Sequence, residues 1–267
     1  MRKALFILAV WMTSVAAVRA NGGENFSFHP GEKLTYRIFW GPFAAGKATL
    51  EVKTIEQVDG HDCYRLIANA TTTGLIDLLF HVDSTIESWM DTEKLFSRRC
   101  RENRVEGDRT YRNEFIYRYN QQQTIVTNLL RHTAVTFPLA EHVQDIVSAV
   151  YFIRTQPLQL NKPNEVLVNT GDTNRLVRLL PDQRKTIWTR PLGDNPALRV
   201  EPKPTLTVIS HNKGRMWVWL SDDTLHIPLL LYAPVRLGTA RFVLQNIETT
   251  NPVLLRRIRA RAEANNN

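Results

Sequence analysis

The chain has 267 residues, of which 43% are hydrophobic and 22% charged, and its formal net charge is +8 at pH 7. This length suits one large all-β domain, which can bury a full core without disulfide bonds. Two cysteines are too few for a disulfide-dense scaffold, and no basic run is interleaved with aromatic residues. The composition therefore argues against a disulfide framework and against a nucleic-acid-binding protein.

The first 20 residues have the pattern of a secretory signal peptide. Arg2 and Lys3 precede an apolar run, and Val18-Arg19-Ala20 fits a small-x-small cleavage site. The run is shorter than the ~20 residues of a membrane-spanning helix, and no cysteine follows that would carry a lipid anchor. We predict a periplasmic chain that begins near Asn21, has no transmembrane helix and carries a net charge of about +5 once the three cations of the signal are removed.

Turn signals and alternation predict many short strands before residue 138. The segment 32–40 alternates, with Leu34, Tyr36 and Ile38 on one face. Asp59-Gly60 is a two-residue hairpin signal. The apolar stretch 74–80 fits either one helical turn or an apolar crossing between strands.

A helix is predicted in the middle of the chain, because apolar residues recur at helical spacing from Val143 to Ile153 and Pro157 follows. Strands resume after it, including two separate strands over 175–180 and 185–189, on either side of Pro181, and a strand over 205–209. A hairpin is predicted with arms 216–220 and 224–232 around Ser221-Asp222-Asp223, and Ala233-Pro234 is expected to break the chain before the last strand.

These patterns predict a mainly β protein. We expect a strongly curved antiparallel sheet or barrel of about twelve to fourteen strands, with one central helix that covers an opening or one face. The predicted segments are a signal peptide over 1–20, a single β-rich domain over 21–250 with a first β half at 31–137, a helix at 142–156 and a second β half at 164–248, and a basic tail at 251–267 that fits a frayed helix.

The two cysteines, Cys63 and Cys100, are expected to remain free and buried. In a simple meander they lie two strands apart, a separation of roughly 9.6 Å. This exceeds the roughly 7 Å that a disulfide allows between Cα atoms.

Three blocks of sequence carry a family resemblance: GEKLTYRIFWGPFAAGKATLEV, DIVSAVYFIRTQPL and MWVWLSDDTLHIPLLLYAPVRLGTARFVL. Together and in this order they resemble the signature blocks of the domain of unknown function 3108 family. The resemblance implies an exported bacterial envelope protein rich in antiparallel strands, with no assigned biochemical function. A looser, fold-level analogy is to the lipoprotein-carrier half-barrels. The positions that stand in these blocks are Gly31, Glu32, Asp145, Arg154, Ser221, Asp222, Asp223, Pro228 and Gly238, and His226 stands where the family pattern often has arginine.

The common catalytic motifs are absent from the sequence, which has no phosphate-binding glycine loop, GxSxG, HExxH or CxxC. We predict no metal, since His61 and Cys63 lack further ligands nearby in the sequence, and no cofactor. Asp222 and Asp223, together with Glu87 or Asp145, are candidate paired carboxylates for glycoside hydrolysis. The favoured interpretation gives Asp145 to a helix N-terminus and Asp222 and Asp223 to a turn.

Aromatic side chains suggest a ligand pocket if the interior is hollow, and a packed core if it is not. Arg154 is expected at the surface, and if it points inward it needs a carboxylate or a bound anion. The residues predicted to line the pocket are Trp40, Phe43, Trp89, Tyr151, Arg154, Trp217 and Trp219, and Trp188 is a further aromatic candidate.

The favoured function is a non-enzymatic binding or carrier protein for a lipid or another apolar envelope component, with an anionic membrane surface as a further partner. One alternative is an envelope scaffold or assembly factor that acts through protein contacts. The other is an enzyme that acts on cell-wall glycans.

Overall fold

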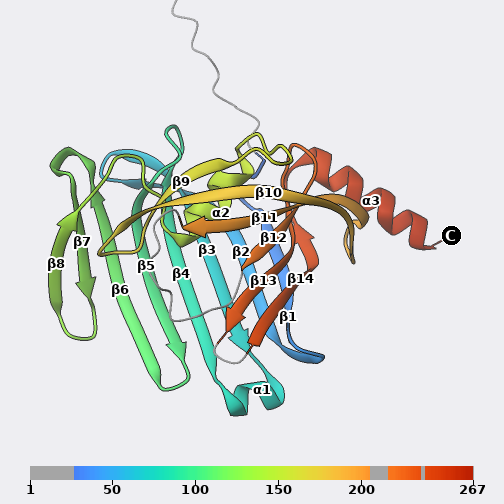
Figure 1. Ribbon diagram of the computed structural model, residues 1–267, viewed down its shortest axis with the longest axis horizontal. Helices are drawn as coiled ribbons and strands as arrows, with labels where there is room; N and C mark the ends of the chain where they lie inside the picture. The colour runs from blue at the N-terminus through green and yellow to red at the C-terminus, as the bar shows by residue number, and fades with distance from the viewer. Residues whose placement is uncertain (1–26, 205–215, 236–237, 267) are drawn as a thin grey trace, which may run out of the picture.

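Fourteen antiparallel strands form one curved sheet, in which the first and last strands pair at the centre (Figure 1). The computed structural model describes residues 27–204, 216–235 and 238–266. Strands β1 to β8 follow one another outward from the centre on one side, and β14 back to β9 do so on the other. The fold class and strand number agree with the prediction.

The strands of the first half are β1 (Lys33–Trp40), β2 (Phe43–Val58), β3 (His61–Thr72), β4 (Val82–Asp91), β5 (Ser97–Glu106), β6 (Arg109–Arg118), β7 (Gln123–Asn128) and β8 (Thr133–Pro138). Those of the second half are β9 (Asn164–Asn169), β10 (Asn174–Thr189), β11 (Gly193–Pro204), β12 (Trp217–Ser221), β13 (Pro228–Val235) and β14 (Gly238–Glu248). The helices are α1 (Gly74–Leu79), α2 (Ile146–Arg154), α3 (Pro252–Asn266) and the short 3₁₀ helix η1 (Tyr119–Gln121).

Local sequence explains the strands and their turns. In β1, Leu34, Tyr36 and Ile38 are buried and their neighbours are more exposed, as the alternation predicts. Asp59 and Gly60 both have positive φ, 49° and 79°, which is the backbone of a tight type I′ hairpin turn between β2 and β3.

Helix α2 lies on the concave face of the sheet and packs against both halves. Val147 and Tyr151 contact apolar side chains of β2, β3 and β4, while Ile153 packs with side chains of β9 to β12. Figure 1 shows β10 and β11 crossing the upper part of the molecule beside this helix. Packed side chains therefore fill the space between the sheet and α2, where an open cavity was one of the two predicted outcomes.

The sheet is curved but not closed. The edge strands β8 and β9 are not paired by backbone hydrogen bonds among the described residues. The β9–β10 turn nevertheless approaches the edge formed by β7 and β8. Asn174 Nδ2 donates to the carbonyl oxygen of Pro138 at 3.0 Å, and Asn169 Nδ2 donates to Thr124 Oγ1 at 3.3 Å. These bonds join the β9–β10 turn to β7 and to the end of β8.

The second half differs from the prediction in two details. Strand β10 is continuous from Asn174 to Thr189, because a bulge at Pro181/Gln183 absorbs the proline that seemed to divide it. Ala233 and Pro234 lie within β13, at its hairpin end, where Pro234 pairs with Thr239. The predicted strand 205–209 and the predicted signal peptide lie outside the described residues.

Both cysteines are free and buried, as predicted. Cys63 on β3 stands opposite Asp91, and Cys100 on β5 stands opposite Ser88. The two positions thus lie on strands that flank β4 and are offset along it. Burial raises the pKa of Cys63 to about 12, so its thiol is protonated and unreactive at neutral pH.

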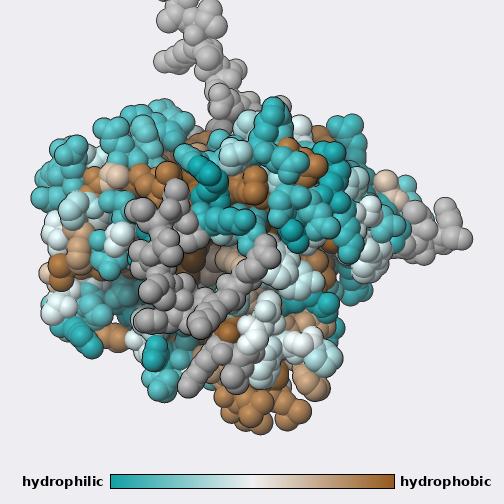
Figure 2. Space-filling view, viewed as in Figure 1, coloured by the Kyte–Doolittle hydropathy of each residue, from teal (hydrophilic) through white to brown (hydrophobic). Residues whose placement is uncertain are grey.

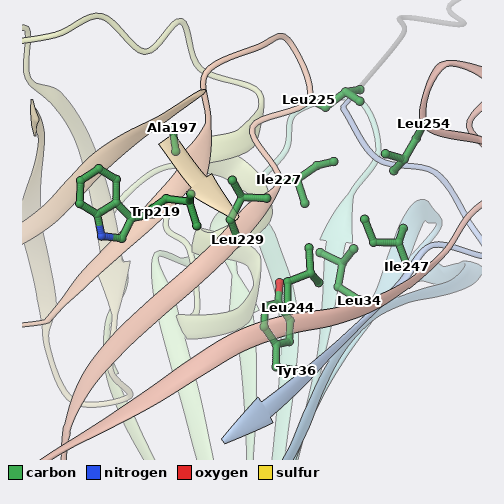
Figure 3. Packing of buried hydrophobic residues seen from close by; sticks show 11 residues of the cluster. Leu34, Tyr36, Ala197, Trp219, Leu225, Ile227, Leu229, Leu244, Ile247 and Leu254 are labelled. Atoms are coloured by element: carbon green, nitrogen blue, oxygen red, sulfur yellow. The ribbon is translucent and has the colours of Figure 1, made fainter. Parts of the chain in front are cut away.

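One apolar cluster joins the centre of the sheet to α3 (Figure 3). Leu34 of β1, Leu244 of β14 and Leu229 of β13 converge there, and Leu254 of α3 covers them with 1% of its surface exposed. The predicted basic tail is therefore an ordered helix whose first turn belongs to the core.

Candidate functional site

A buried ion pair joins Arg154, the last residue of α2, to Glu32, the residue before β1. Arg154 Nη1 lies 2.5 Å from Glu32 Oε1, and Arg154 Nη2 lies 3.0 Å from Glu32 Oε2. Both side chains are 1% exposed. The expected surface position of Arg154 is therefore wrong, and the inward alternative with a carboxylate partner is confirmed.

The remaining donors of Arg154 bind backbone oxygens. Nη2 donates to Ser27 at 2.8 Å and Nε donates to Leu225 at 3.3 Å, while the guanidinium lies over the rings of Phe28 and Tyr151. Burial lowers the pKa of Arg154, but the Glu32 carboxylate outweighs burial and holds the pKa above its usual value. With its hydrogen bonds made within the chain, Arg154 fixes the chain before β1 to α2 and offers no free cation to a ligand.

Asp145 caps the N-terminus of α2, as predicted. Its Oδ1 accepts from the backbone N–H groups of Val147 and Ser148, and its Oδ2 accepts from the hydroxyl groups of Ser88 and Ser97. Burial raises the pKa of Asp145 in spite of these bonds. The side chain is 2% exposed and saturated with donors, so it is not available as a general acid or base for a polymer substrate.

The Ser221-Asp222-Asp223 segment is a turn that anchors α3. Asp223 Oδ1 accepts from Ser221 Oγ and from the N–H of Leu225, and Asp223 Oδ2 lies 2.5 Å from Arg257 Nη1 of α3. Burial raises the pKa of Asp223, but these donors outweigh it, so the pKa lies below its usual value. Asp222 pairs with Arg184 of β10. The two aspartates therefore hold structure, as the favoured interpretation predicted.

Two glycines and a proline of the same blocks also have structural positions. Gly31 has a φ of +88°, and a Cβ there would lie 3.3 Å from Thr250, so glycine permits the chain to enter β1 beside the end of β14. Gly238, with a φ of +92°, opens β14. The carbonyl oxygen of Pro228 accepts from Tyr36 Oη at 2.9 Å. His226, in the turn before Pro228, has a ring Nδ1 3.1 Å from the carbonyl oxygen of Ser221.

The predicted pocket aromatics do not converge. Phe43 is 64% exposed, Trp89 is buried on the convex face where its indole N–H donates to Glu56, and Trp219 is part of the core. Trp217 stacks on Tyr232, and Trp40 packs at the opposite end of β1 from Glu32. The structure therefore does not bring these residues together in one pocket.

A hollow of about 280 Å³ lies elsewhere, on the outer face of the sheet where the end of β10 folds over β13 and β14. We call it the outer hollow. Its lining residues are Phe39 of β1, Ile187 and Trp188 of β10, Leu230 and Tyr232 of β13, and Arg241, Val243 and Gln245 of β14.

The outer hollow combines an apolar wall with one cation. Trp188 is 56% exposed, which is unusual for so large an apolar side chain. The guanidinium of Arg241 lies over the Phe39 ring, 4.9 Å from its centroid. Its Nε is buried and has no hydrogen-bond partner among the described residues. An unsatisfied buried donor beside apolar side chains fits a ligand that has both an apolar part and an acceptor.

Sequence patterns named one residue of this site, Trp188, but did not predict the site itself. Alternation places Arg241 and Val243 on one face of β14, and Leu230 and Tyr232 on one face of β13, but it does not show what covers that face. The missing information was that β10 folds back over it. The available signal was the pair Ile187-Trp188, two large apolar neighbours in one strand, of which Ile187 is buried and Trp188 is 56% exposed at the hollow.

The comparison with protein families gives a match over residues 35–245 to the family described as "Protein of unknown function (DUF3108)". The chain belongs to this family. The match spans all 14 strands except parts of β1 and β14. Glu32 of the buried ion pair lies just outside the matched range, whereas its partner Arg154 lies within it.

A solved structure supports the fold of this DUF3108 protein. It is a β-barrel-like protein of the domain of unknown function DUF1849 from Brucella abortus, 8% identical, with a TM-score of 0.54 over 84% of this chain and 99% of that one. At this identity the likeness concerns the fold alone. The comparison with curated proteins gave no match.

Among the described residues of the DUF3108 chain, no helix has both the length and the apolar character needed to cross a bilayer.

Proposed function

We propose that this DUF3108 protein is a non-enzymatic binding protein of the cell envelope, which takes an amphiphile with an anionic group into the outer hollow. The observation that carries the proposal is the buried Nε of Arg241, which lacks a partner among the described residues while it borders an apolar wall. An anionic oxygen at this nitrogen would satisfy it, and the apolar part of the same molecule would cover Trp188.

The size of the outer hollow limits the ligand. A volume of about 280 Å³ lies just below the usual range of small-molecule pockets, roughly 300–1,000 Å³. It suits one acyl chain or one aromatic group rather than a whole diacyl lipid. The ligand class is therefore a single-chain amphiphile with a carboxylate or phosphate.

The proposed location is the periplasm. It is supported by the basic start, apolar run and cleavage pattern of residues 1–20. N-terminal sequencing of the protein recovered from a periplasmic extract should begin near Asn21. Recovery of the uncleaved chain from the cytoplasm would contradict this part of the proposal.

Titration calorimetry with dodecanoate tests the ligand class, and dodecanol serves as the uncharged comparison. The wild type should bind dodecanoate more tightly than dodecanol. Arg241→Gln should weaken dodecanoate about tenfold, roughly 1.4 kcal/mol, with little effect on dodecanol. Trp188→Ala should weaken both, because it removes the apolar wall.

Matched controls lie outside the hollow. Phe43→Ala removes an equally exposed aromatic side chain, and Arg112→Gln removes an exposed cation on β6. Neither should change the affinity. Undetectable binding of dodecanoate, or equal binding by the wild type and both hollow variants, would overturn the proposal.

A further inference from the structure

The connection between β3 and β4 carries a protruding group of apolar side chains. We define the apolar tip as Leu75, Leu78 and Leu79 of α1 together with Phe43 at the start of β2. Their exposed fractions are 78%, 83%, 73% and 64%. Figure 2 shows a hydrophobic cluster at the lower end of the molecule, where α1 lies in Figure 1.

The rest of α1 is fixed to the sheet by packing and hydrogen bonds. The leucines are therefore exposed on a helix whose position is fixed. Ile76 packs against the apolar cluster of Ile38, Ala45 and Ala240. The N–H of Thr73 donates to Ala45 at 2.9 Å. Leu75, Leu78 and Leu79 stand at helical positions i, i+3 and i+4, which form one face, and this face points away from the sheet.

The end of α1 is held as firmly as its start. The N–H of Gly107, in the β5–β6 turn, donates to the carbonyl oxygen of His81 at 2.7 Å. A Cβ at Gly107 would lie 2.9 Å from the ring of Phe80, so that ring rests on the turn. The apolar tip therefore projects from a firm base on both sides.

Two exposed cations stand behind the tip. Arg37 and Lys47 face each other on β1 and β2, and Lys47 is opposite Thr71, two residues before the N-cap of α1. This places them roughly 7–10 Å back along the strands from the helix. Neither forms an ion pair with a carboxylate in the part of the chain that the structure describes.

Of the described carboxylates at this end, Glu106 pairs with Arg104, and Asp77, Asp83 and Asp108 form no ion pair with Arg37 or Lys47. Asp77 of α1 is held by Thr72 Oγ1 at 2.5 Å and by His81 Nδ1 at 2.8 Å. Asp83 is exposed on β4, opposite Thr71.

The area of the tip favours a lipid surface over a protein partner. Burying one large apolar side chain contributes about 1.5–3 kcal/mol, at about 25 cal/mol per Å² of apolar surface. The four side chains of the tip therefore present roughly 250–500 Å² of apolar surface. A stable protein interface needs about 800 Å² from each partner. A fluid bilayer has no such requirement, because it surrounds a convex tip without a complementary pocket.

We infer that the apolar tip inserts into an anionic lipid surface while Arg37 and Lys47 contact the head-group phosphates. Interfacial elements bury their apolar face ~5–10 Å deep, which matches the distance from the tip back to the two cations. The tip lies at the β3–β4 end of the sheet and shares no residue with the outer hollow, so the inference does not depend on the proposed ligand.

Vesicle flotation tests the inference with the mature chain from Asn21, which contains every described strand and helix. The wild type should float with vesicles of 70% phosphatidylcholine and 30% phosphatidylglycerol. The triple variant L75S/L78S/L79S should lose at least tenfold in partitioning to these vesicles. The double variant R37Q/K47Q should lose binding to these vesicles and keep any weak binding to pure phosphatidylcholine.

The control V135S/V253S removes two apolar side chains that are 53% and 50% exposed elsewhere, and it should float like the wild type. Unchanged flotation of the triple variant would overturn the inference, as would a wild type that stays in the lipid-free fraction. A concentration-dependent dimer that the triple variant abolishes would overturn it in favour of self-association.

Discussion

The buried pair of Glu32 and Arg154 makes two distant segments depend on each other. Removing one partner leaves an uncompensated buried charge, which costs about 3–5 kcal/mol. We expect Glu32→Gln and Arg154→Met each to lower the free energy of unfolding by about this amount in urea titrations. The double variant should lose less than the sum of the two.

The exposed pair of Glu165 and Arg178 provides the control for that experiment. Its side chains are 47% and 52% exposed, so Glu165→Gln should change the free energy of unfolding by less than about 1 kcal/mol. Equal changes in the free energy of unfolding for Glu32→Gln and Glu165→Gln would show that burial of the Glu32–Arg154 pair does not increase its contribution to stability.

The ion pair of Asp223 predicts a pH dependence. The pKa of Asp223 is lower in the folded protein than its ordinary value of 3.8. Its carboxylate therefore stabilises the fold above pH 3.8, and this contribution is lost as the pH falls through the folded pKa. The stability difference between the wild type and Asp223→Asn should be full at pH 6 and should shrink at pH 3. A difference that stays constant over this range would contradict the assignment.

The burial of charged side chains was the feature that sequence patterns predicted least accurately. Arg154 was expected at the surface because arginine is seldom fully buried. Its partner Glu32 lies 122 positions earlier, and no local pattern connects two residues so far apart. Asp145 was assigned correctly as a helix cap because capping is local, although its bonds to Ser88 and Ser97 were not predicted.

At the scale of the element, α2 depends on its cap. Asp145→Ala removes the acceptor of two backbone N–H groups, which costs about 0.5–2 kcal/mol. It also leaves the buried hydroxyl groups of Ser88 and Ser97 without this acceptor, at about 1–3 kcal/mol each. We expect a loss of more than about 2 kcal/mol in urea unfolding.

The N-cap of α1 provides the comparison. Thr73 stands at that position but its side chain makes no capping hydrogen bond. Thr73→Ala should therefore leave the free energy of unfolding almost unchanged. A loss as large as that of Asp145→Ala would mean that helix propensity, and not the cap, explains both.

Elements with local signals were predicted well, and elements shaped by distant contacts were not. The Asp59-Gly60 turn and the helix in the middle of the chain follow from residues within a few positions. Pro234 was expected to end its strand, but it stands at the hairpin end of β13, where the missing N–H costs little. The fold of β10 over the outer face of β13 and β14 depends on the curvature of the whole sheet, so the outer hollow had no local signature.

At the scale of the whole molecule, α2 and the pairing of β1 with β14 join the two halves of the sheet. We expect one cooperative unfolding transition, with coincident midpoints from tryptophan fluorescence and from far-UV circular dichroism. Two separated midpoints would indicate that the halves unfold independently.

Truncation tests the same junction. A chain that ends before Gly238 lacks β14 and α3, which exposes the edges of β1 and β13 at the centre of the sheet. We expect this chain to aggregate. A chain that ends after Arg261 keeps Leu254 and Arg257 and should fold, so similar behaviour of the two would contradict the central role of β14.

The pairing of β1 with β14 also fixes the order in which the strands can find their partners during folding. A ribosome releases β1 early, and the hairpins from β1 to β8 can form as each strand emerges. One edge of β1 must wait for residues 240–248, more than 200 positions later, before its backbone groups find their partner. Throughout synthesis the growing chain thus carries an open strand edge, where another chain can pair. The last strand of this protein, rather than its first, decides when that exposure ends.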